Sequence, residues 1–200
     1  MNAPEHRLCV YCGSGPGKTP AYMAAAKSLG QAIARDGIGL VYGGGNVGLM
    51  GEVARAVLEN GGHVTGIIPE FLVARERMLE GVNELIVTQN MHERKMAMFH
   101  RATGFVALPG GVGTLEELTE ISTWAQLDQH QKPIIICNVE GFWDPYLALI
   151  DHMRAEQFIR EGLEVRTDIV DNALDVIPTY HFRKANNRAQ VPLAALRGKL

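Results

Sequence analysis

The sequence has few cysteines, no long apolar run and no excess of charge of one sign. Its three cysteines are too few and odd in number for a disulfide framework, which predicts a reducing compartment, the cytoplasm. No apolar run approaches the roughly 20 residues that span a bilayer, and the first residues do not resemble a signal peptide, so we predict no membrane association. The formal net charge of −3 creates no general attraction to nucleic acid, and we expect no such partner.

The chain is rich in apolar residues and long enough to fold by itself. With 200 residues, of which 46% are hydrophobic, disorder is excluded, and we predict a single domain over residues 1–200. Residues 176–200 contain five Lys or Arg and no Asp or Glu. We expect this basic C-terminal segment to be a mobile or surface-wrapping tail, with a phosphate-binding or partner-binding arm as the alternative.

Short β-type runs alternate with helical patterns along the chain. The expected strands are residues 8–12, 38–42, 63–68, 84–88, 105–108 and 134–137, and the expected helices are residues 20–35, 47–59, 91–102, 113–127 and 144–156. Strands that alternate with helices of this length predict βαβ units and a parallel sheet. The predicted fold class is therefore α/β, a doubly wound parallel sheet with helices on both faces.

Glycine is the informative residue, because many of its 22 copies gather directly after apolar runs. The clusters lie at residues 13–17, 43–48 and 110–113, after the first, second and fifth expected strands. In a doubly wound sheet, ligands bind outside the carboxyl ends of the strands, near the point where the strand order reverses. Three glycine segments at one edge therefore predict an anionic ligand, a phosphate, held by backbone N–H groups and helix N-termini.

Several familiar motifs are incomplete in this sequence. Residues 13–19 lack the glycine spacing of a P-loop, which argues against a nucleoside triphosphatase. Residues 43–48 match G-x-G-x-x-G, but the acidic residue that NAD binding requires comes late, at Glu70 after a proline. Cys9 and Cys12 have redox spacing, but they point to opposite faces of a strand, as small buried hydrophobes do. The histidines form no ligand spacing, and we predict no metal.

Two segments, residues 91–96 and 108–117, carry candidate chemistry. In the second, a buried strand ends in a proline and two glycines and then opens a helix. Free N–H groups and a hydroxyl of this turn predict an anion cradle made by Gly110, Gly111, Gly113 and Thr114. Glu117 lies one turn into the helix and is directed toward the same mouth, where the helix N-terminus favours its ionised form. Taken alone, Glu117 would be interpreted as a solvated first-turn carboxylate and Arg94 as a surface helix arginine.

Together the two segments resemble the signatures of the Lonely Guy (LOG) family, the cytokinin riboside 5′-monophosphate phosphoribohydrolases. Residues 109–117 match the family's P-G-G-x-G-T-x-x-E signature, and Arg94-Lys95 match its Arg-Lys pair at a helix start. Similar segments follow the family's order at residues 11–14, 42–45, 48–51 and 123–127. Members of this family are often labelled lysine decarboxylases, but no residue here points to a pyridoxal phosphate lysine.

The resemblance implies a Rossmann-like fold, a homodimer with sites shared between subunits, and no cofactor or metal. It implies hydrolysis of the N-glycosidic bond of an adenosine-type 5′-monophosphate, N6-prenylated or AMP, to the free base and ribose 5-phosphate. Glu117 would stabilise an oxocarbenium-like transition state and orient the attacking water, and Arg94 would contact ribose or phosphate oxygens and orient Glu117. The residues expected to bind the substrate or its phosphate are Ser14, Gly45, Glu76, Lys95, Gly110, Gly111, Gly113 and Thr114.

Two alternatives remain open at this stage. A related hydrolase would act on AMP or on nucleotides with other bases, with base specificity in the loops around residues 68–90. A non-catalytic nucleotide-binding or regulatory protein would use the same phosphate cradle. A phosphate cradle alone does not need the carboxylate of Glu117, which argues against a protein that only binds. Tight AMP binding without turnover would favour the non-catalytic binding protein.

Overall fold

The fold is a parallel sheet in which most strands lead into a helix. The computed structural model describes residues 4–76, 78–160, 162–164 and 166–186. The strands are β1 (Arg7–Tyr11), β2 (Gly39–Tyr42), β3 (Val64–Pro69), β4 (Glu84–Thr88), β5 (Gly104–Ala107), β6 (Ile134–Cys137) and β7 (Asp168–Val170). The helices are α1 (Pro20–Arg35), α2 (Gly48–Glu59), α3 (Glu70–Glu76), α4 (Met91–Arg101), α5 (Val112–Gln126), α6 (Asp144–Ala155) and α7 (Val176–Asn186), with 3₁₀ turns at Val139–Gly141 and Ala173–Asp175.

The strand order reverses in the middle of the sheet. The order is β4-β3-β2-β1-β5-β6-β7, and every pairing is parallel. The chain winds outward from β1 to β4 and then returns to place β5 on the other side of β1. In the β1–β5 pairing Leu8 lies opposite Gly104 and Tyr11 opposite Ala107. The predicted doubly wound α/β fold is confirmed, and its switch point lies between β1 and β5.

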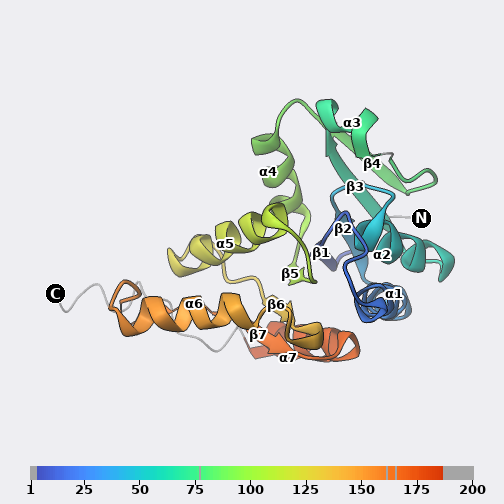
Figure 1. Cartoon of the computed structure of the whole chain (residues 1–200). Helices are drawn as coiled ribbons and strands as arrows, with labels where there is room; N and C mark the ends of the chain where they lie inside the picture. Colours follow the sequence, from blue (N-terminus) through green and yellow to red (C-terminus); the bar gives the residue numbers. More distant parts are fainter. Residues whose placement is uncertain (1–3, 77, 161, 165, 187–200) are drawn as a thin grey trace.

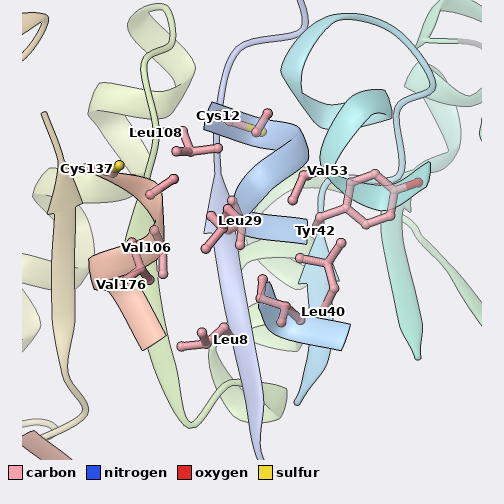
Figure 2. Packing of buried hydrophobic residues seen from close by; sticks show 14 of the residues in the cluster. Leu8, Cys12, Leu29, Leu40, Tyr42, Val53, Val106, Leu108, Cys137 and Val176 are labelled. Atoms are coloured by element: carbon pink, nitrogen blue, oxygen red, sulfur yellow. The ribbon is translucent and has the colours of Figure 1, made fainter. Parts of the chain in front are cut away.

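Helices cover both faces of this sheet (Figure 1). One buried cluster joins the strands to α1, α2 and α7, and Figure 2 shows Leu8 of β1, Leu29 of α1 and Val53 of α2 among its side chains. The second cluster joins the strands to α4, α5 and α6. Cys9 and Cys12 are buried, carry free thiols and belong to opposite clusters, as the alternation of side chains along a strand predicts.

Local signals explain why two of the helices begin where the sequence predicts. The hydroxyl of Thr19 accepts a hydrogen bond from the Ala21 N–H at 3.3 Å, and Pro20 then opens α1. The Asn90 side chain accepts from the Glu93 N–H at 2.9 Å at the start of α4. This capping places the residue after Glu93, the candidate Arg94, within the first turns of a well-defined helix.

Three elements were not predicted: α3, the short edge strand β7, and α7. The last of these covers residues 176–186, where the sequence predicted a mobile or surface-wrapping tail. Val176, Ile177 and Tyr180 are buried, and the Tyr180 hydroxyl lies 2.7 Å from the Thr103 hydroxyl. This part of the basic segment is therefore a docked helix, and residues 187–200 lie outside the described residues.

Candidate active site

The loops after β1 and β5 meet at the switch point. The Gly13 N–H donates to the Pro109 carbonyl at 3.0 Å, which joins the two loops beyond the ends of their strands. A pocket of about 270 Å³ opens beside this junction. Ser14, Gly110 and Gly111, all expected to contact the substrate, are among the residues that line it. The structure thus brings the first and third glycine clusters together at one edge of the sheet.

The start of α5 leaves backbone N–H groups available at this edge. Gly111 is the N-cap and makes no side-chain cap, and the first helical hydrogen bond runs from the Leu115 N–H to the Gly111 carbonyl at 3.0 Å. The N–H groups of the intervening residues precede that bond, as an anion site at a helix N-terminus requires. Those residues include Gly113 and Thr114. The Thr114 side chain is buried against Gly110, where an added Cβ would lie only 2.1 Å from the Thr114 hydroxyl oxygen.

The first and second glycine clusters are also packed against each other. The N–H groups of Leu49 and Met50 donate to the Gly13 carbonyl at 3.1 and 3.3 Å, so α2 begins directly on the β1 loop. Gly48 has a φ of +59°, and a Cβ there would lie 2.4 Å from the Ser14 backbone. The position of Ser14 in the pocket therefore depends on a glycine at residue 48.

Replacing Gly48 with alanine is expected to destabilise the fold and weaken substrate binding together. The positive φ alone costs about 1–2 kcal/mol for a residue with a Cβ, and the contact with the Ser14 backbone adds to that cost. Gly61→Ala is the matched control, because Gly61 has a φ of +73° but open space around its Cβ position. Urea unfolding should show a larger loss of stability, and kinetics a larger rise in KM, for Gly48→Ala than for Gly61→Ala. Equal effects of the two substitutions would contradict the role of the Ser14 contact.

Arg94 lies buried in the first turns of α4, with 6% of its surface exposed. Its Nε donates to the Ile67 carbonyl at 3.1 Å, and its Nη2 donates to the Gly43 carbonyl at 3.0 Å. The guanidinium thus links the ends of β3 and β2. A Cβ on Gly43 would lie 2.3 Å from the Arg94 Nη2, so this glycine is needed for the contact. The remaining nitrogen, Nη1, lies 3.8 Å from the Met91 sulfur, a weak acceptor.

Glu117 lies in the second turn of α5, and its charge reaches the end of β1. Burial raises the pKa of the Cys9 and Cys12 thiols, and the negative charge of Glu117 raises both further. The positive charge of Arg94 acts in the opposite direction on the pKa of Cys9. Because Coulombic effects decline with distance, Arg94 and Glu117 both lie within electrostatic reach of the same buried sulfur. Arg94 thus lies on α4 against the Ile67 carbonyl of β3 and the Gly43 carbonyl after β2, and Glu117 lies on α5, the helix that Lys95 links to α4.

The structure places Lys95 between two carboxylates of α5, whereas the sequence interpretation expected it at the substrate phosphate. Its Nζ lies 2.6 Å from a carboxylate oxygen of Glu116 and 2.9 Å from one of Glu120, both on α5. Partial burial lowers the pKa of Lys95, but the hydrogen bonds to these carboxylates outweigh it and raise that pKa above its usual value. The ammonium is thus held between two carboxylates on the neighbouring helix.

The segment after α3 lies against the second glycine cluster. Gly45 and Met78 form an antiparallel bridge, and the Leu79 N–H donates to the Gly44 carbonyl at 3.3 Å. Glu76 is the last residue of α3, two positions before Met78, and its side chain lies outside the described residues. Gly45 is therefore placed on the same edge as the pocket, next to the segment in which base specificity was expected.

Two aromatic residues of the pocket were missed by the sequence analysis. Tyr22 of α1 and Phe142 line the pocket, and their rings meet edge to face with centroids 5.7 Å apart. A Cβ on Gly17 would lie 2.4 Å from the Tyr22 ring, so the glycine loop packs directly on it. Tyr22 stands alone among the alanines of α1 and Phe142 directly precedes Trp143, so neither has the spacing of a known binding motif and only the fold brings them together.

The described part of the chain holds neither a cluster of metal ligands nor a helix fit to cross a membrane. No three His, Cys, Asp or Glu side chains gather there as metal ligands. Among the same residues, no helix combines the length and the apolar character needed to cross a bilayer.

Comparison with known sequences places the chain in a known family. A family profile described as "Possible lysine decarboxylase" matches residues 50–179. The chain is 52% identical over 155 residues to the rice (Oryza sativa subsp. japonica) cytokinin riboside 5′-monophosphate phosphoribohydrolase LOG, covering 78% of this chain and 64% of that protein. It is 50% identical over 153 residues to the enzyme LOG7 of Arabidopsis thaliana, covering 76% of this chain and 70% of that protein. The chain thus spans slightly less than two thirds of the rice relative's length.

Solved structures with the same fold include proteins whose names are not those of phosphoribohydrolases. The molybdenum cofactor binding protein of Rippkaea orientalis is 25% identical, with a TM-score of 0.65, and the match covers 91% of this chain and 98% of that one. The molybdenum cofactor carrier protein of Chlamydomonas reinhardtii is 21% identical with a TM-score of 0.63, and the match covers 92% and 99%. The second likeness concerns the fold alone.

Fold and site together define a Rossmann-type α/β protein with a glycine-rich helix N-terminus at its switch point. The profile match covers more than half of the chain, and the curated relatives share about half of their aligned residues with it. The chain belongs to the LOG family, whose curated members are named cytokinin riboside 5′-monophosphate phosphoribohydrolases.

Proposed function

We propose that this protein hydrolyses the N-glycosidic bond of an adenosine-type nucleoside 5′-monophosphate, releasing the free base and ribose 5-phosphate. The observation that carries the proposal is that α5 holds the Glu117 carboxylate one turn after a helix N-terminus suited to phosphate, while Lys95 links α5 to α4, the helix of the buried Arg94. Arg94 and Glu117 both act electrostatically on Cys9, and α5 supplies both Glu117 and the cradle. The names of relatives that are about 50% identical support the same reaction.

The phosphate would be held by backbone groups at the start of α5. N–H groups there, together with the helix dipole, favour an anion without any side-chain charge. We assign phosphate contacts to Gly110, Gly111, Gly113, Thr114 and Ser14. Gly45 and Glu76 would contact the remainder of the nucleotide, since the backbone places both segments along the same edge.

With the phosphate held, the glycosidic carbon would lie near Glu117. Cleavage breaks the bond between this carbon and the base nitrogen, and positive charge develops on the ribose ring. The Glu117 carboxylate would stabilise that charge and accept a proton from the water whose oxygen attacks the same carbon. The departing base takes up a proton from solvent as its bond to the carbon breaks, which balances the proton that Glu117 accepts from the attacking water. Arg94, fixed by the Gly43 and Ile67 carbonyls, would hold substrate oxygens and orient Glu117. No step requires a cofactor or a metal.

A non-catalytic binding protein is the second candidate. It is favoured by one observation, the likeness of the fold to a molybdenum cofactor binding protein that is 25% identical. Such a protein would use the anion cradle and would hold its ligand unchanged. The two candidates differ in one measurable property, which is the release of free base from a bound nucleotide.

A product assay tests the proposed function. The purified protein is incubated with AMP and, separately, with isopentenyladenosine 5′-monophosphate, and free base is separated from nucleotide by chromatography. We expect free base from at least one of them, and the ratio of rates reports whether the prenyl group is recognised. Nucleotide binding without free base from either substrate would overturn the proposal in favour of the binding protein.

We also propose that the protein acts in the cytoplasm as a homodimer, with α6 in the contact between the copies. This helix has no buried residue, and Figure 1 shows it extending away from the sheet beside α5. Leu149, Met153 and Phe158 are 48%, 37% and 85% exposed. Acidic Asp144 lies near the start of the helix and basic Arg154 near its end, so an antiparallel pair of copies would place opposite charges together.

Replacing Phe158 with glutamate is expected to convert the dimer into monomers. The Phe158 N–H donates to the Met153 carbonyl at 2.9 Å after Gln157, whose φ is +63°, and this turn holds the ring outward. Phe182→Glu on α7 is the matched control, because that ring is also exposed, at 64%. Sedimentation velocity should show monomers for Phe158→Glu alone. A monomeric wild type, or a dimer that survives Phe158→Glu, would contradict this surface.

A further inference from the structure

The helices that carry the two candidate catalytic residues are joined by an ion-pair bridge between the neighbouring residues. Lys95 directly follows Arg94 on α4, and Glu116 directly precedes Glu117 on α5. The Lys95 ammonium lies 2.6 Å from Glu116 and 2.9 Å from Glu120. The bridge therefore connects the same two places in the chain that the proposed reaction needs to hold together.

The side chains of the bridge are partly shielded from solvent, so the ion pairs can hold the two helices in a fixed arrangement. The Lys95 side chain is 18% exposed, and the Glu120 side chain is 25% exposed. Glu116 is half exposed. A single exposed ion pair contributes little, but one ammonium shared by two carboxylates has less freedom than an isolated pair. Both carboxylates belong to one helix, so the lysine fixes α5 at two points one turn apart.

The bridge also compensates charge beside the phosphate cradle. Glu116, Glu117 and Glu120 place three carboxylates in the first turns of α5. Carboxylates four positions apart on a helix repel each other, and a substrate phosphate at the N-terminus would add more negative charge. Lys95 offsets two of the three carboxylates and leaves Glu117 as the one directed to the proposed chemistry.

We propose that Lys95 is a positioning residue, which sets the placement of Glu117 relative to Arg94 by bridging α4 to Glu116 and Glu120 instead of binding the substrate phosphate. This inference rests on the proposed function and reassigns a residue that the sequence pattern placed on the phosphate. A positioning residue changes the rate of the bound complex, because a misplacement of about 1 Å costs on the order of 10²-fold in rate. A phosphate ligand present in both ground and transition states changes KM instead.

The test compares Lys95→Met with the double variant Glu116→Gln/Glu120→Gln. The first removes the ammonium, whereas the second leaves the ammonium in place and frees it from its carboxylates. If Lys95 acts through the bridge, both variants should lose kcat by a similar factor, about tenfold or more, with little change in KM. Lys95→Arg keeps the charge and the reach to both carboxylates, so it should recover part of kcat. All variants are first checked for a native circular dichroism spectrum and a cooperative thermal transition.

Arg101→Met is the matched control on the same helix. Arg101 pairs with Glu84 of β4 at 3.8 Å, away from α5, and its loss should leave kcat within about twofold. The inference would be overturned if Lys95→Met raised KM with an unchanged kcat, or if the double glutamine variant kept its kcat and bound the nucleotide more tightly. If the wild type is active and either result is found, the role of the Lys95 bridge is contradicted and the proposed function is not. A wild type that releases no base overturns the proposed function and the inference with it.

Discussion

Replacing Glu117 with glutamine is expected to reduce kcat for free-base release by about 10²–10⁴-fold, while nucleotide binding persists. Glutamine has nearly the same shape, but it lacks the negative charge that would stabilise an oxocarbenium-like transition state, and it cannot accept a proton from water. The phosphate contacts come from the backbone at the start of α5, which this change leaves intact. The measurement is steady-state release of base, together with AMP affinity by calorimetry.

The control for this variant is Glu59→Gln, which neutralises an exposed carboxylate at the end of α2. We expect wild-type kinetics from it, since Glu59 lies at the opposite end of its helix from the glycine clusters. A Glu117→Gln protein with a native thermal transition and undiminished kcat would remove the carboxylate from the mechanism. Loss of AMP affinity in parallel with kcat would show that Glu117 holds the substrate instead of acting on its transition state.

Replacing Arg94 with lysine is expected to be nearly as damaging as replacing it with alanine. The guanidinium donates to two carbonyls on different strands, those of Gly43 and Ile67. A lysine ammonium has no planar fork and cannot reproduce that geometry, so a buried carbonyl loses its donor at a cost of about 1–3 kcal/mol. We expect kcat/KM to fall by on the order of 10²-fold, and urea unfolding should show the loss of stability.

A second variant tests whether the position of the Arg94 guanidinium matters, and not only the presence of an arginine. Gly43→Ala leaves Arg94 in the chain but puts a Cβ 2.3 Å from its Nη2, so the guanidinium must move. We expect the same direction of change in kcat/KM as for Arg94→Lys. Arg35→Lys, at the exposed end of α1, is the matched control for the arginine-to-lysine change. Wild-type turnover by Arg94→Lys would show that charge alone is sufficient at this position.

Several elements of the fold could be predicted because their signals are local. α1 begins at Pro20 after the cap of Thr19, and the apolar run Ile134–Cys137 forms a strand buried on both faces. β7 has only three residues, too few to show a periodicity. α7 begins without an acidic residue in its first turn, and it is stabilised by the burial of Val176, Ile177 and Tyr180 against the rest of the fold.

The candidate site likewise contains residues that a local pattern predicts and a residue whose contacts no local pattern predicts. The cradle residues Gly110, Gly111 and Gly113 were assigned from one short segment, because a strand that ends in glycines and opens a helix presents its N–H groups wherever it is placed. Lys95 was assigned to the phosphate from its position beside Arg94, and its observed partners, Glu116 and Glu120, lie more than 20 residues further along the chain. A motif names residue types, but it does not say which neighbours a long side chain will meet.

The sequence by itself determined the α/β class, the family and the single sheet edge at which the glycine clusters gather. These follow from periodicity, local helix and strand ends, and the rule that parallel strands present their carboxyl ends together. Only the tertiary structure decided that Arg94 spans Gly43 and Ile67, that Tyr22 meets Phe142, and that Lys95 bridges two helices. Those contacts join residues remote in the chain, and their geometry is set by packing across the sheet and its helices, to which no local pattern is sensitive.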